Sequence, residues 1–211
     1  MRRLLAILAV FCGVFGFVQS ALADPFFLPT DPISTPTSGL ASAPLPDGRV
    51  IFMGGDDGSN VFGSSEIYDP SSGSFSAGPS LVEARSGAGA APLPDGRVLV
   101  VRGGTLGGRL SSAEIYNPAT GQFTLTDSMD VRRSKPVVAP LPDGKVLVAG
   151  GREDFTALSS VEIYDPVTGT FSPGNPMPGP RREATGAPLP DGTVLIAGGA
   201  ESMSLIPMGG H

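Results

Sequence analysis

The feature that most constrains this chain is a short string that recurs at one fixed spacing. Leu-Pro-Asp-Gly begins at four positions that lie 48 residues apart, at Leu45, Leu93, Leu141 and Leu189. Three further residue types keep the same spacing: Tyr68, Tyr116 and Tyr164; Phe75, Phe123 and Phe171; Arg85, Arg133 and Arg181. A fixed period of this length is typical of repeat architectures, in which each unit is one small supersecondary structure.

Each unit is expected to form a small antiparallel sheet. Pro-Asp-Gly favours a tight turn because Pro presets φ and Gly accepts a positive φ. The apolar run that follows it, such as Val98 to Val101, is typical of a strand buried on both faces. A third strand is expected around each Glu-Ile-Tyr, and a fourth near each repeated phenylalanine. Four strands per unit predict a β-propeller blade and an all-β fold.

The repeated polar and aromatic residues are interpreted first as structural. The recurring tyrosines are expected to pack between blades, because residues that recur with the period of a repeat mark its core. The glutamates of Glu-Ile-Tyr could pair with the repeated arginines, within one blade or between two. A buried pair of this kind fixes geometry more than it adds stability.

The unit resembles the kelch motif. A Gly-Gly pair follows each apolar run, at Gly54-Gly55, Gly103-Gly104, Gly150-Gly151 and Gly198-Gly199. A tyrosine and then an aromatic residue come next, with Phe standing where kelch units usually have Trp. The resemblance covers residues 37–199 and is strongest to kelch-like arrays of exported bacterial proteins. It implies a β-propeller that serves as a binding scaffold, and it implies no reaction.

The repeat divides the chain into blades of unequal completeness. Complete blades are expected at 37–84, 85–132 and 133–180, and a partial blade at 181–211, where no Glu-Ile-Tyr occurs. Residues 24–36 form an N-terminal extension that could supply a ring-closing strand. Three interpretations stay open: a distorted four-blade ring, a half ring that self-associates through its open blade edges, and a fragment of a longer propeller. We expect a small, open or incomplete array.

The first 23 residues have the pattern of a secretory signal. Arg2 and Arg3 precede an apolar run from Leu4 to Val18, and Ala21-Leu22-Ala23 matches a cleavage site. The predicted location is therefore secreted or periplasmic, with an uncleaved N-terminal anchor as the alternative. After cleavage no stretch approaches the roughly 20 apolar residues that a membrane-spanning helix needs, so no stable span is expected.

Cleavage would also limit the chemistry of the chain. Cys12 is the one cysteine and lies within the signal, so we expect no disulfide and no thiolate metal site. Loss of Arg2 and Arg3 changes the formal charge from −6 to −8. This balance argues against a nucleic-acid partner, because contacts to phosphate need a basic face. We expect no cofactor and no metal.

The candidate ligand-binding residues lie mainly in loops that break the repeat, where function tends to concentrate. They are Asp56, Asp57 and Asn60 after the first Gly-Gly; Arg109 after the second; Arg152, Glu153, Asp154 and Phe155 after the third; and Arg132 and Arg182 in the loops that link blades. The acidic loop from Asp56 does not match the spacing of a calcium loop. Arg102 is the remaining candidate for ligand binding. It is interpreted as an extra residue before Gly103-Gly104, in a β-bulge. The bulge is either simply compensated by the shorter loop that follows or directs the side chain toward the central channel.

A binding module is favoured over an enzyme. The expected partner is a protein or a carbohydrate recognised by the propeller loops. The alternative is a fragment of a larger propeller enzyme, glycan-active or oxidase-like, that lacks its catalytic residues. A copper-radical oxidase needs a Cys and two His ligands, whereas the mature chain would keep only His211. A carboxylate pair for glycoside cleavage is open in principle, and a truncated product without its own function is a third reading.

Overall fold

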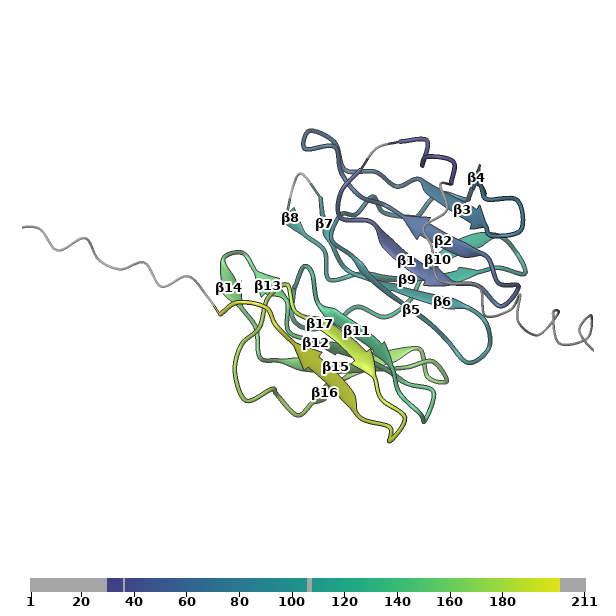
Figure 1. The fold of residues 1–211 in the computed structure, drawn as a ribbon. Coiled ribbons are helices and arrows are strands. Elements are labelled where there is room, and N and C mark those ends of the chain that lie inside the picture. The colour runs from purple at the N-terminus through teal and green to yellow at the C-terminus, as the bar shows by residue number, and fades with distance from the viewer. Residues whose placement is uncertain (1–29, 36, 106–107, 202–211) are drawn as a thin grey trace, which may run out of the picture. The chain divides into compact units, whose positions relative to one another are not determined.

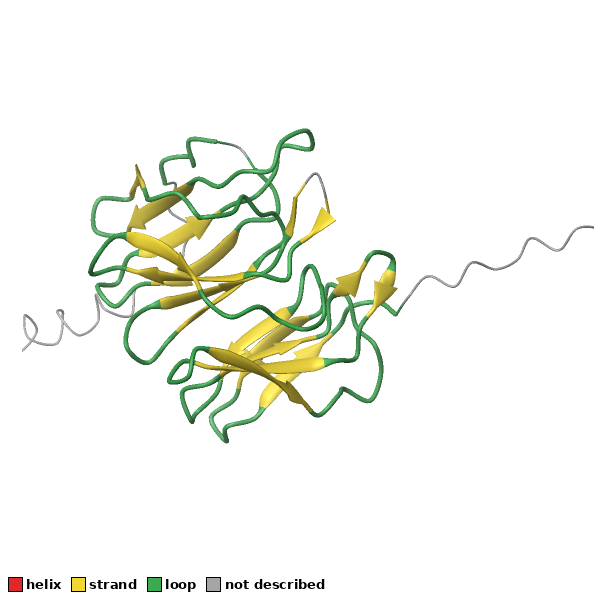
Figure 2. Cartoon of the chain, turned by 180° about the vertical axis from the view of Figure 1, so that it is seen from behind, coloured by secondary structure: helices red, strands yellow, loops and turns green. Residues whose placement is uncertain are grey.

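The computed structural model describes residues 30–35, 37–105 and 108–201, with Arg109 described by its backbone alone. Every strand belongs to the unit formed by residues 31–211. In this described part all regular structure is β, joined by turns and loops (Figure 2). No helix long and apolar enough to cross a membrane occurs there. The expected all-β fold is confirmed.

Three four-stranded antiparallel sheets follow one another along the chain (Figure 1). Their strands are β1 (Ala41–Pro44), β2 (Val50–Met53), β3 (Ser65–Asp69) and β4 (Ser74–Ala77) in the first blade; β5 (Gly89–Pro92), β6 (Val98–Val101), β9 (Ala113–Asn117) and β10 (Gln122–Leu125) in the second; β11 (Val137–Pro140), β12 (Val146–Ala149), β15 (Val161–Asp165) and β16 (Thr170–Gly174) in the third. Each sheet keeps the sequence order of its strands, as in a propeller blade.

Three short hairpins complete the described strands. β17 (Thr185–Pro188) and β18 (Val194–Ala197) begin a fourth blade, while the pairs β7 (Gly104–Thr105) with β8 (Gly108–Arg109) and β13 (Arg152–Glu153) with β14 (Thr156–Ala157) lie in loops. Within the described residues β18 pairs only with β17, so the array is open rather than a closed ring. The predicted ring-closing strand falls largely outside the described residues, and residues 30–35 form no strand.

The Pro-Asp-Gly turn explains why the first two strands of each unit pair. In the first blade the Leu45 amide donates to the Arg49 carbonyl at 2.8 Å. Asp47 Oδ1 accepts from the Arg49 amide at 3.1 Å, and Gly48 takes a φ of 87°. That φ favours glycine because a Cβ would be strained there. The same turn closes the corresponding hairpin in the other three units.

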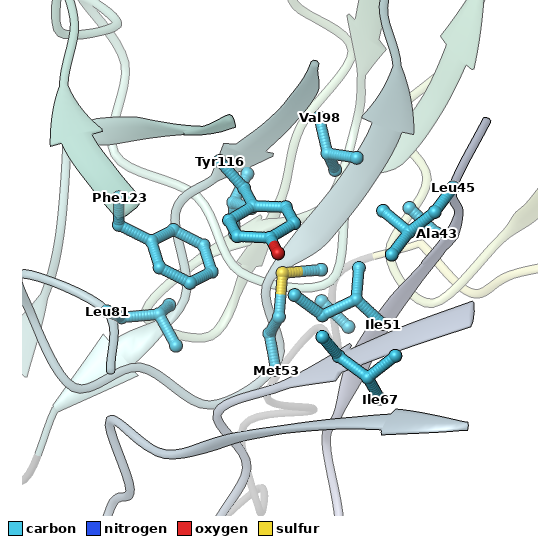
Figure 3. Packing of buried hydrophobic residues seen from close by; sticks show 11 residues of the cluster. Ala43, Leu45, Ile51, Met53, Ile67, Leu81, Val98, Tyr116 and Phe123 are labelled. Atoms are coloured by element: carbon cyan, nitrogen blue, oxygen red, sulfur yellow. The ribbon is translucent and has the colours of Figure 1, made fainter. Parts of the chain in front are cut away.

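The core lies between blades. All four residues of β6 are fully buried, as predicted for a strand covered on both faces. Val98 and Val100 pack with Tyr116 and Phe123 against the first blade, and Figure 3 shows Tyr116 and Val98 beside Ile51 and Met53 of that blade. Residues of the opposite face of β6 join the cluster formed with the third blade. Successive blades are therefore held together by apolar contacts, which scale with the area removed from water.

The predicted packing of the repeated tyrosines between blades is confirmed in two of the three units. Tyr116 and Tyr164 are 3% and 2% exposed and pack on the preceding blade. Tyr68 is only half-buried and packs on Phe75 at a ring-centroid distance of 5.0 Å. The difference follows from position, because no blade precedes the first one among the described residues.

Arg102 is not an extra residue, and the expected bulge is wrong. The bridges Ser38–Asp56, Ser86–Gly104, Ser134–Arg152 and Arg182–Ala200 keep the 48-residue spacing through the second blade. Arg102 therefore occupies the position of Gly54, Gly150 and Gly198. It has the same left-handed conformation, with a φ of 59° against 63–70° for the glycines. The backbone at Arg102 therefore follows the same course as in the other units, and an arginine adopts a conformation that usually requires glycine.

Candidate functional site

The repeated arginines and glutamates form an arrangement that we call the Arg–Glu clamp. In the third blade Arg133 Nη2 lies 2.8 Å from Glu162 Oε1. The same carboxylate accepts from the backbone amides of Asp130 at 2.8 Å and Val131 at 3.3 Å. Arg133 Nη1 donates to two carbonyls of its own blade. The clamp thus ties the loop that enters a blade to the middle of that blade, and the expected pairing is confirmed.

The second blade repeats the clamp with Arg85 and Glu114, whose side chains are fully buried. Apart from Arg133 Nε, which has no hydrogen-bond partner among the described residues, the groups of these clamps bond to each other and to the backbone, so the pairing is structural. They leave the loop residues as candidates for ligand binding.

An open cavity of about 400 Å³ lies where equivalent loops of three blades meet. Apart from Val61 and Thr105, its lining comes from three columns of residues related by the repeat: Ser38, Ser86 and Ser134; Gly39, Gly87 and Lys135; Asp56, Gly104 and Arg152. Backbone hydrogen bonds connect the middle column, from Gly87 to the Gly39 carbonyl at 2.8 Å and from Lys135 to the Gly87 carbonyl at 3.0 Å. The floor of the cavity is therefore fixed by main-chain contacts between blades.

One wall of this cavity is acidic and internally bonded. Asp56 Oδ2 accepts from the Ser86 hydroxyl of the next blade, and Asp56 Oδ1 accepts from the Gly58 amide at 3.1 Å. Both carboxylate oxygens of Asp56 thus have donors.

The opposite wall is basic. Lys135 Nζ lies 3.1 Å from Glu183 Oε1, and this hydrogen bond is the main reason that the pKa of Glu183 is lowered, with Arg152 and Arg182 adding to the effect. The Nε atoms of Arg152 and Arg182 are buried and have no hydrogen-bond partner among the described residues. One cation therefore contacts the Glu183 carboxylate, and two more act on it from a greater distance. Such a site favours a further anionic group.

The structure brings together only some of the predicted site residues. Asp56 and Arg152 line the cavity. Arg182 helps to lower the pKa of Glu183, the partner of Lys135 on the basic wall. Asp57 and Asn60 instead bond to each other at 3.1 Å within their own loop. The Asn60 side chain also contributes most to the lowered pKa of Asp57.

The other candidates lie away from the cavity lining. Glu153, Asp154 and Phe155 form the exposed end of the β13–β14 hairpin, where Phe155 is 81% exposed. Arg132 is exposed in the loop between the second and third blades. Arg109 lies in β8, and its side chain is outside the described atoms. Arg102 is fully buried and does not belong to the cavity lining.

Sequence reasoning missed Lys135 and Glu183. Both have a positive φ, 51° and 57°, at the position where the first two units have Gly39 and Gly87. Non-glycine residues in this conformation are strained, and such residues cluster at functional sites. The signal was present in the sequence as a lysine and a glutamate in a column of glycines. Among the described residues no group of three or more His, Cys, Asp or Glu could hold a metal ion.

Residues 134–178, which carry Lys135 and Arg152 and most of the third blade, match the kelch motif family. The match places a kelch motif in the third blade. The other units repeat its Pro-Asp-Gly turn at the same 48-residue spacing, and the first and second blades also share its strand order. No curated protein matches the chain. The kelch motif indicates a protein-binding β-propeller module, a fold that in general serves binding rather than catalysis.

Proposed function

We propose that this chain is an exported binding module that captures an acidic segment of a partner protein in the cavity between its kelch loops. The observation that carries the proposal is the cavity itself, because it gathers Lys135 and Arg152 from positions that are distant from Asp56 in the sequence. Concave sites with a few convergent polar groups are the usual places for ligands.

The preference for an acidic partner follows from the basic wall. Lys135, Arg152 and Arg182 all act on the carboxylate of Glu183, although the chain as a whole is acidic. A carboxylate from a partner could pair with the guanidinium of Arg152, which lines the cavity, and hydrogen bonds between charged groups are about twice as strong as neutral ones. Phe155 stands three residues beyond Arg152 and offers an aromatic contact of the kind enriched at interfaces.

Export is supported by the N-terminal sequence alone, since the first 23 residues lie outside the described part of the chain. The charged start, the apolar run and the small-residue cleavage pattern fit a secretory signal. Expression of the full chain in a bacterium, followed by mass measurement of the exported protein, tests this part. An exported product that begins at Asp24 is expected, and a product that stays in the cytoplasm would contradict export.

Binding is tested with two labelled peptides of equal length, one rich in Glu and one with Gln at the same positions. We expect the Glu peptide to bind and the Gln peptide not to bind in a fluorescence-polarisation titration. Arg152→Gln should weaken the Glu peptide roughly tenfold or more, the effect of losing one charge-assisted hydrogen bond. Arg97→Gln is the matched control, because Arg97 pairs with Asp95 at 2.7 Å in an exposed turn away from the cavity lining.

Two results would contradict the proposed site. Equal affinity for the two peptides would show that the basic wall does not select charge. Equal weakening by Arg152→Gln and Arg97→Gln would show that any binding reflects general electrostatics rather than this cavity.

A further inference from the structure

The Arg102 guanidinium is buried without adequate partners. Its side chain is fully buried, and its Nε and Nη2 have no hydrogen-bond acceptor among the described residues. Arg102 Nη1 reaches the Leu110 carbonyl at 3.4 Å. The nearest carboxylate, Glu162 of the third blade, is 3.9 Å from Arg102 Nη2, which is too far for a hydrogen bond.

The charges around this guanidinium do not cancel. Glu162 Oε1 already bonds to Arg133 at 2.8 Å, and the same carboxylate also accepts from two backbone amides. Two buried arginines therefore share one buried carboxylate. The exposed Glu153 and Arg132 also act on Arg102, with opposite signs. Burial and the neighbouring Arg133 lower the pKa of Arg102 to about 9, so the side chain is still protonated at neutral pH. A buried charge is unfavourable unless another charge compensates it.

The backbone is also rearranged at this junction. Between the first two blades Gly55 donates to the Arg85 carbonyl and Arg85 donates to the Phe62 carbonyl, at 2.9 and 3.1 Å. The same two bonds join the third blade to β17–β18 through Gly151, Arg181 and Leu158. At the junction of the second and third blades, the equivalent bonds from Gly103 to the Arg133 carbonyl and from Arg133 to the Leu110 carbonyl are both missing, although all three residues are described. The Leu110 carbonyl accepts from Arg102 instead. The arginine side chain thus separates two backbone segments that are bonded at both other junctions.

We propose that Arg102 and Arg133 bind a small monovalent anion, of the size of a halide, between the second and third blades. The unpartnered nitrogens are Nε and Nη2 of Arg102 and Nε of Arg133. The two guanidiniums adjoin each other, because Arg102 Nη2 and Arg133 Nη2 lie 3.9 and 2.8 Å from the same Glu162 oxygen. The full burial of both arginines restricts the ligand to a small ion. The anion would restore the missing connection between two blades that contribute to different walls of the cavity.

The test compares chloride with gluconate, which is too large to enter a buried site. Thermal unfolding of the purified protein, expressed from the full chain, is followed in sodium chloride and in sodium gluconate at equal ionic strength. We expect the wild-type midpoint to be higher in chloride by roughly 2–4 °C, the shift that about a fivefold excess of ligand over its Kd gives in a domain of this size. Arg102→Gly should abolish the difference, and Arg97→Gln should retain it.

Arg102→Gly restores the residue of the other three units, so we expect this variant to fold. An equal chloride response in the wild type and Arg102→Gly, or no response in the wild type, would overturn the proposal. A second measurement does not depend on the variant: wild-type crystals are soaked in bromide and examined by anomalous diffraction. A peak beside Arg102 Nη2 supports the site, and peaks on the exposed surface alone, an adventitious ion only, overturn it.

Discussion

The first and second blades contain the same glutamate in two different surroundings. In the second blade Glu114 is fully buried against Arg85 and also accepts from the amides of Val82 and Glu83. In the first blade Thr37 stands where the arginine would be, and the corresponding Glu66 is half-buried. Glu66 accepts from the amide and the hydroxyl of Ser34, which is itself exposed.

The difference shows that a repeated residue has a repeated role only when its partner is also repeated. The fourth unit shows the reverse case, because Arg181 is exposed and donates to the Gly198 carbonyl at 2.8 Å. Its glutamate has no counterpart, since the fourth unit lacks Glu-Ile-Tyr. The complete clamp therefore occurs only in the second and third blades among the described residues.

The largest effect is expected from breaking a complete clamp. Arg85→Ala leaves Glu114 buried without its cation, so we expect it to lower the free energy of unfolding by about 3–5 kcal/mol. The measurement is urea unfolding followed by circular dichroism, with wild-type protein beside the variant. A loss below about 1 kcal/mol would mean that the buried pair behaves like a surface ion pair. That result would contradict the distinction drawn between Glu114 in the second blade and Glu66 in the first.

An intermediate effect of opposite sign is expected at Thr37. Its Oγ1 is buried and has no hydrogen-bond partner among the described residues. Thr37→Val removes this hydroxyl and keeps the branched shape, so the free energy of unfolding should rise by roughly 1 kcal/mol. The same urea experiment measures it. A destabilised variant would show that the hydroxyl has a favourable interaction in the folded protein.

The smallest effect is expected from Glu66→Gln. The glutamine oxygen can still accept from Ser34, and no buried arginine loses its counter-ion. The free energy of unfolding should therefore change by no more than about 0.5 kcal/mol. Glu114→Gln is the matched substitution in the second blade and should be clearly more destabilising. Equal losses in the two variants would contradict the distinction between the blades.

Much of the fold was predictable because its determinants are local. The Pro-Asp-Gly turn needs only neighbouring residues, and the runs of Val, Leu and Ala after it mark the buried central strands. The pairing of Arg85 with Glu114 was suggested by their shared period. Arg102 was misplaced because the adjacent Gly103-Gly104 resembles the Gly-Gly pairs of the other units. Its true register appears in backbone dihedrals and bridges between strands.

The candidate site was less predictable because it depends on contacts between units. Asp56 and Arg152 were identified as loop residues, but nothing in the sequence brings loops so far apart to one cavity until blades are packed. Lys135 was overlooked because a surface lysine is common. What distinguishes Lys135 is its positive φ, a backbone conformation that Gly39 and Gly87 adopt at the equivalent positions. Arg132 and Phe155 could not be separated from the lining residues by composition, since all lie in polar loops.

The four Pro-Asp-Gly turns have a consequence for biosynthesis. Each turn closes through atoms only four residues apart, as in Leu45 and Arg49, so a hairpin can form as soon as its own segment leaves the ribosome. Near-identical hairpins can also pair with the wrong sister strand while the chain is incomplete, a known failure of repeat proteins. Divergent residues at equivalent places, such as Phe52 against Val100, make the mispaired strands fit less well. The variation between units is therefore expected to favour pairing of each strand with its own neighbours during synthesis.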